Sequence, residues 1–165
     1  MSESATYLGK DDAAWAQTVA HDDPVQRRLA VYALGEIRPQ AQPIVPALDA
    51  ALQDQVNWVR VWTAAAIAKA TGDPRAVAAL IAEIQAVEAF VRSLVAWHLG
   101  RLGAEFPGIE GGIDALRQLL GDDDPSVRIE AALALQALRS KGSLPSGCAF
   151  LSRHGRWLPS WRMAL

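Results

Sequence analysis

Four arginines recur along this chain with similar neighbours, and this internal repeat restricts the fold more than any other feature of the sequence. Arg27, Arg60, Arg92 and Arg128 are 33, 32 and 36 residues apart. Each is followed by mostly apolar residues three, four, seven and ten positions later. This spacing follows the period of an α-helix and lacks the two-residue alternation of a strand. Self-similarity at such a period is typical of stacked helical repeats.

Asp-Pro dipeptides indicate where two of these helices begin, at Asp23-Pro24 and Asp124-Pro125. Aspartate caps the free amides of a first turn, and proline fits the first helical position. A second helix is predicted after each first one by pairs of large aliphatic residues spaced by four. These pairs are Leu48 and Leu52, Leu80 and Ile84, and Leu116 and Leu120. Each pair ends eight residues before the next arginine, so the same rule predicts that residues 11–20 form the second helix of an incomplete opening repeat.

The motif Asp-Pro-x-Val-Arg-x-x-Ala-Ala-x-Ala-Leu, which stands at residues 124–135, resembles HEAT repeats. It is most similar to the short repeats of phycobilisome-lyase-type proteins, and the resemblance covers about residues 11–141. It implies an all-α fold, a short right-handed α-solenoid of about four stacked helical hairpins. We therefore expect a repeat domain at residues 1–141 and a basic, aromatic tail at residues 142–165. That tail is open to three interpretations: a cap on the array, a docking peptide, or a flexible terminus.

HEAT repeats commonly carry an aspartate six residues before the arginine, and the two form a ladder between repeats. The resemblance implies this role for Arg27, Arg60, Arg92, Arg128, Asp54 and Asp122. His21 and Ala86 stand at the aspartate position of the other two repeats, so the continuity of the ladder is open. The fork of donors on arginine suits a partly buried acidic partner, so we expect these arginines to join loops.

A second apolar stripe lies on the far side of the predicted first helices, two residues before and two and five residues after each arginine. Its large members are the candidate partner-binding residues Leu29, Tyr32, Trp58, Trp62, Phe90, Leu94 and Trp97. Large exposed apolar patches are rare on monomers, and tryptophan and tyrosine are favoured interface anchors. Two interpretations are open: a surface for a protein partner or for self-association, or a stripe buried within the fold or beneath the tail.

Charge is divided unevenly along the chain. Residues 1–138 carry 11 basic and 18 acidic residues, whereas residues 139–165 carry five basic and no acidic ones. The acidic body would repel a phosphate backbone, which makes a nucleic-acid partner unfavourable.

Motifs for catalysis or metal binding are absent from the sequence. None of the three histidines stands in a His-Glu pair, so an iron-dependent hydroxylase is not supported. His98 is interpreted either as a satisfied core histidine or as a functional group in a pocket. Cys148 has no second cysteine with which to bind zinc or form a disulfide. We expect no cofactor and no catalytic residue.

The sequence predicts a cytoplasmic protein, because it lacks both a secretory leader pattern and an apolar run of the ~18 residues that a membrane span needs. The predicted function is a non-enzymatic protein-binding scaffold or assembly module. One alternative, implied by the resemblance, is a lyase-like subunit that assists the attachment of a pigment or cofactor to a partner protein. A second alternative is nucleic-acid binding, as in HEAT-like repair glycosylases.

Overall fold

The computed structural model describes residues 6–37, 44–105 and 110–142. Within these ranges the chain forms α1 (Asp12–Thr18), α2 (Pro24–Ile37), α3 (Ile44–Ala51), α4 (Asn57–Thr71), α5 (Pro74–Ala82), the 3₁₀ helix η1 (Glu83–Gln85), α6 (Ala89–Glu105), α7 (Glu110–Leu119) and α8 (Pro125–Gly142). The β-type pairing found there is an isolated bridge between Tyr7 and Lys10. The all-α prediction is confirmed.

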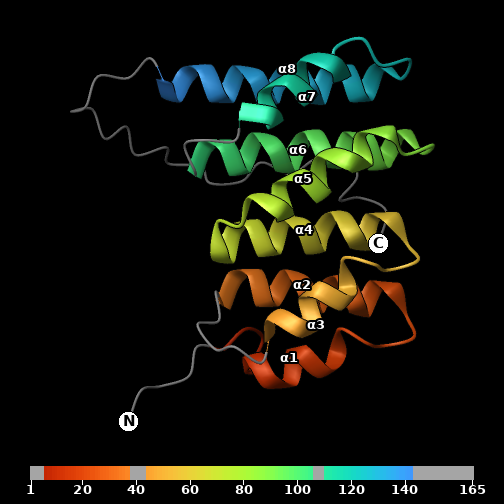
Figure 1. Cartoon of the computed structure of the whole chain (residues 1–165), viewed down its shortest axis with the longest axis vertical. Coiled ribbons are helices and arrows are strands. Elements are labelled where there is room, and N and C mark those ends of the chain that lie inside the picture. The colour runs from red at the N-terminus through yellow and green to blue at the C-terminus, as the bar shows by residue number, and fades with distance from the viewer. Residues whose placement is uncertain (1–5, 38–43, 106–109, 143–165) are drawn as a thin grey trace.

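The helices alternate between two rows, as Figure 1 shows. The first row stacks α2, α4, α6 and α8, and each of these helices contains one of the recurring arginines. The second row contains α3, α5 and α7, each joined to the next first-row helix by a short turn. The predicted second helix at residues 11–20 is present as α1, which packs against α2. The predicted stack of helical hairpins is therefore confirmed.

Local capping explains where the helices begin and end. Asp23 Oδ1 accepts a hydrogen bond from the N–H of Val25 at 2.9 Å, and Asp124 Oδ1 accepts one from the N–H of Ser126 at 2.8 Å. Gly72 follows α4 with a φ of 69°, a left-handed conformation that glycine adopts without steric cost. The aliphatic pairs differ from expectation at their second member. Leu52 and Leu120 lie in the turns after α3 and α7, and Ile84 lies in η1.

Small residues allow the first-row helices to approach closely. A Cβ atom on Gly35 would lie 3.1 Å from the Cβ of Ala66, and one on Gly100 would lie 2.8 Å from the Cβ of Ala134. At the contact between α4 and α6, the same repeat positions are occupied by Ala68 and His98. The larger side chain fits the looser packing there, because α6 lies closer to α8 than to α4.

The predicted tail, from residue 143 onward, lies outside the described residues. Across the part of the chain that the structure describes, no helix is long and apolar enough to cross a bilayer.

Replacing Gly100 by alanine is expected to destabilise the array. The added methyl group meets the backbone of α8 as well as the Ala134 side chain, so α6 and α8 must separate. Overpacking of this kind costs about 1–3 kcal/mol, which is expected to outweigh the gain in helix propensity of about 1 kcal/mol.

Gly111→Ala is the matched control, because its Cβ would meet only the flexible end of Ile81 at 3.4 Å. Urea unfolding of both variants should show a lower unfolding free energy for Gly100→Ala and an unchanged or higher one for Gly111→Ala. Equal effects would contradict the close-packing argument.

Candidate functional site

Each recurring arginine is first bonded to the turn that precedes its own helix. Its Nη1 donates to the backbone carbonyls that stand six and five residues earlier in the chain. The accepting carbonyls belong to His21 and Asp22 for Arg27, Asp54 and Gln55 for Arg60, Ala86 and Val87 for Arg92, and Asp122 and Asp123 for Arg128. The arginine therefore joins this turn to its own helix in all four layers.

The other half of the fork reaches a carboxylate of the next layer. The bonds from Nε and Nη2 are 2.6 and 2.8 Å from Arg27 to Asp54, 2.6 and 3.0 Å from Arg60 to Glu83, and 2.7 and 2.7 Å from Arg92 to Asp122. Asp54 and Asp122 thus pair with the arginine of the preceding layer. The fourth arginine, Arg128, has no such carboxylate within the described residues.

Glu83 is the ladder residue that sequence reasoning missed. Ala86 lacks a carboxylate, and Glu83, three residues earlier at the start of η1, supplies one to Arg60 instead. The ladder is therefore continuous from Arg27 to Asp122. The signal in the sequence that could have identified Glu83 is an acidic residue within one helical turn of Ala86.

His21 also replaces part of the role of the missing aspartate. Its Nδ1 accepts the N–H of Asp23 at 3.0 Å, as Asp54 accepts that of Val56 and Asp122 that of Asp124. The turn is thus closed by a side-chain acceptor in three of the four layers.

The ladder is partly buried, which makes it a structural element. The side chains of Arg92 and Asp122 are 12% and 7% exposed. The hydrogen bonds from Arg92 hold the pKa of Asp122 well below its usual range, despite the opposing effect of burial. A carboxylate with this environment stays ionised and fixed.

A row of aromatic rings crosses the layers. Ring centroids are 5.8 Å apart for Tyr7 and Tyr32, 5.6 Å for Tyr32 and Trp62, and 5.9 Å for Trp62 and Trp97. The Arg101 guanidinium lies 4.9 Å from the centroid of the Trp97 ring. These spacings are typical of favourable aromatic and cation–π contacts. The aromatic row therefore contributes to the packing between layers.

Burial divides the predicted partner-binding residues. Trp62 and Leu94 are only 9% and 1% exposed, so these two are core residues and not part of an open surface. Leu29, Tyr32, Trp58 and Trp97 are partly buried, and Phe90 is exposed. The offsets from each arginine place the whole stripe on the side away from the second-row helix of the same hairpin. They take no account of the neighbouring first-row helices. Each first-row helix is also covered on its flanks by neighbouring first-row helices.

His98 lies in the core between two tryptophans. Its ring centroid is 4.6 Å from that of Trp62 and 4.7 Å from that of Trp97, both nearly edge-to-face. Its Nε2 is buried without a hydrogen-bond partner in the described residues. The histidine is thus a core residue but not a fully satisfied one. Burial, with a contribution from Arg101, lowers the pKa of His98 to about 3.

Apolar residues remain exposed along the starts of the first-row helices. We call Val25, Trp58, Val87 and Phe90 the first-turn edge. Val87 is 92% exposed and Phe90 48%, whereas Trp58 is partly buried. Next to them, Asn57 Nδ2 donates to Glu88 Oε2 at 2.7 Å, which joins the starts of α4 and α6. The first-turn edge therefore spans neighbouring layers.

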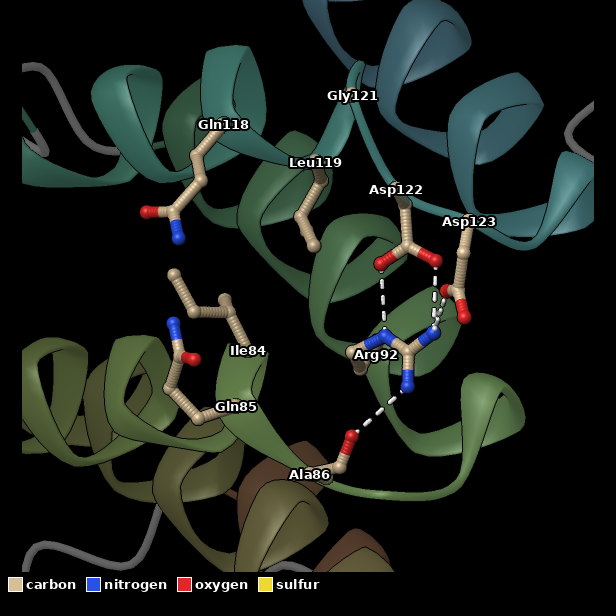
Figure 2. Close-up of a pocket in the computed structure, with 9 residues that line it drawn as sticks. All are labelled: Ile84, Gln85, Ala86, Arg92, Gln118, Leu119, Gly121, Asp122 and Asp123. Atoms are coloured by element: carbon tan, nitrogen blue, oxygen red, sulfur yellow. Dashed lines mark hydrogen bonds and ion pairs between the residues drawn. The ribbon is translucent and has the colours of Figure 1, made fainter.

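A cleft of about 310 Å³ opens between η1 and the turn from α7 to α8. Figure 2 shows Gln85 and Gln118 on one side of it and the ladder pair Arg92 and Asp122 on the other. The donors and acceptors of the ladder pair are already used within the chain. Among the described residues, no group of three or more His, Cys, Asp or Glu side chains is positioned to hold a metal ion.

Comparison with known proteins agrees with this architecture. The family profile of HEAT repeats matches residues 13–99 and again residues 81–151. An engineered protein of known structure is similar over 81% of this chain and 68% of its own, with a TM-score of 0.54 and 21% identity. The complex of CpcE and CpcF of phycocyanin lyase from Nostoc sp. PCC7120 is matched over 85% of this chain and 70% of that one, with a TM-score of 0.47 and 20% identity. No curated protein matches the sequence. At 21% identity the likeness to the engineered protein concerns the fold alone.

Arg92→Lys is expected to destabilise the array, although it conserves the charge. An ammonium cannot reach Asp122 and the two turn carbonyls together, so buried acceptors lose their donors. We expect a loss of about 2 kcal/mol in the free energy of unfolding. Arg75→Lys is the control, because the Arg75 side chain is 87% exposed and its change should cost almost nothing. Similar losses in both variants would argue against the ladder.

Acid is expected to destabilise the protein through His98. Its pKa is lowered by folding, so the unfolded chain binds the proton first, and stability falls as the pH drops from 6.5 towards about 3. The slope from this one group approaches about 1.4 kcal/mol per pH unit. In urea unfolding, His98→Gln should remove that slope between pH 6 and 4.5. The carboxylates are the same in both proteins, so they contribute equally to the pH dependence of the unfolding free energy. An unchanged slope would refute the assignment.

Proposed function

The chain belongs to the HEAT-repeat family, and we propose that it acts as a non-enzymatic scaffold that binds a protein partner along the first-turn edge. The observation that carries the proposal is the exposure of Phe90 and Val87 beside the partly buried Trp58. An aromatic side chain that is half exposed, next to a rigid apolar neighbour, is the usual form of an interface anchor.

The rigidity of this edge supports the proposal. Trp58 and Phe90 stand in the first turns of helices that the Arg60 and Arg92 forks fix to their turns. The bond between Asn57 and Glu88 fixes the two turns relative to each other. A preorganised surface loses little conformational entropy when a partner binds.

Other surfaces offer less to a partner. In the cleft beside η1, the charged groups are occupied by the ladder, and two glutamine amides remain as polar contacts. Of the candidate partner-binding residues, Trp62 and Leu94 are buried in the core. Of the two alternatives, attachment of a pigment and binding of nucleic acid, neither is favoured by a specific contact in the described residues.

Phe90→Glu is expected to abolish partner binding without unfolding the array, because the ring is 48% exposed. The test is quantitative affinity purification of the full-length protein from its native cells, with mass spectrometry of the bound proteins. A specific partner should be depleted roughly tenfold with Phe90→Glu, the effect expected of an interface anchor.

Leu8→Glu is the control, since Leu8 is a 72% exposed apolar residue away from the edge. Circular dichroism should show unchanged helix content for both variants. A partner that binds wild type and Phe90→Glu equally would refute the proposal, as would the absence of any enriched partner.

A further inference from the structure

The last described helix carries two apolar residues on a face that nothing in the described residues covers. Ile129 is 60% exposed and Leu133 37% exposed. The polar residues Gln136 and Ser140, seven and eleven positions after Ile129, are exposed as well. This spacing keeps all four residues on one face of α8. In α2, α4 and α6, by contrast, a following first-row helix covers the corresponding side.

The two ends of α8 carry opposite charges. Asp123, in the turn before the helix, is 91% exposed, and its Oδ1 accepts a hydrogen bond from Nη2 of Arg92 at 2.7 Å. Arg139, near the other end, is exposed and has no acidic partner among the described side chains. A helix with this distribution is complementary to an antiparallel copy of itself, since the acidic start of each lies opposite the basic end of the other. The helix dipoles favour the same orientation.

We propose that the exposed face of α8 is a self-association surface, on which α8 of a second copy of this chain packs in antiparallel orientation about a two-fold axis. One register pairs both the exposed apolar residues and the opposite charges at the two ends of α8. When Ile129 lies opposite Leu133 of the second copy, Asp123 lies level with Arg139 of that copy along the helix axis, because both pairs are centred on Ala131. A two-fold interface repeats each contact twice, so it contains two apolar pairs and two ion pairs.

Charge favours a second copy over the remainder of the chain as the occupant of this face. Residues 143–165 contain three arginines and no aspartate or glutamate. They offer no side-chain carboxylate to Arg139, and they would bring further positive charge next to Arg128 and Arg139. This inference goes beyond the proposed function and does not depend on the first-turn edge.

Sedimentation equilibrium of the full-length protein at increasing concentration tests the proposal. The wild type should show a monomer–dimer equilibrium, and Ile129→Glu should shift it towards monomer. Asp123→Lys and Arg139→Glu should each raise the dissociation constant roughly tenfold or more, because both ion pairs of the dimer become repulsive. An equimolar mixture of these two variants should dimerise again, since every contact between them is attractive.

The matched control is Phe90→Glu, which should dimerise like the wild type. Thermal melting should show that all variants are folded, because the altered side chains are exposed and Arg92 keeps its two bonds to Asp122 when Asp123 is replaced. A wild type that stays monomeric at every concentration would overturn the proposal and leave the face to the tail or to a different protein. A dimer that Ile129→Glu leaves intact, or a mixture that fails to reassociate, would also overturn it.

Discussion

The guanidinium of the recurring arginine is the contact on which the stacking of this protein depends. One side of the fork satisfies two carbonyls of the turn before its own helix, and the other side binds a carboxylate of the next layer. Because the accepting carbonyls stand five and six residues before the arginine, the turn cannot change length without breaking these bonds. The connection from a first-row to a second-row helix has no such requirement, and its length varies between repeats.

Regular stacking also determines where function can be located. The charged groups of the ladder are paired with one another. The aromatic row fills the space between layers, so the middle of the predicted stripe belongs to the core. His98 interrupts this regularity, since an imidazole stands between Trp62 and Trp97 where the other repeats have alanine. Apart from Leu8 and Leu120, the large apolar residues left exposed in the described part of the chain lie on the first-turn edge and on the outer face of α8. The proposed partner site and the proposed dimer surface are thus on separate parts of the molecule.

Most of the fold was predictable from the sequence, because the period of the arginines fixes the helices and their order. The caps at Asp23-Pro24 and Asp124-Pro125 were also predictable, as was the opening half-repeat, since they depend on local chemistry. Glu83 was not, because its carboxylate acts from a different position in the chain and only the three-dimensional arrangement brings it to Arg60. Whether Trp62 and Leu94 are buried stayed open in the sequence for a related reason: a helical wheel represents one helix, whereas these side chains are covered by neighbouring helices.

Each layer needs a carboxylate that reaches the guanidinium of the preceding arginine, whatever the position of that carboxylate in the sequence. Glu83→Ala removes the carboxylate from Arg60, and Ala86→Asp returns one to the position that Asp54 and Asp122 occupy in their own repeats. The free energy of unfolding in urea should fall by about 1–2 kcal/mol in Glu83→Ala, since the pair is partly exposed. In the double variant it should return close to the wild-type value. A Glu83→Ala protein as stable as the wild type, or a double variant no more stable than Glu83→Ala, would contradict the claim.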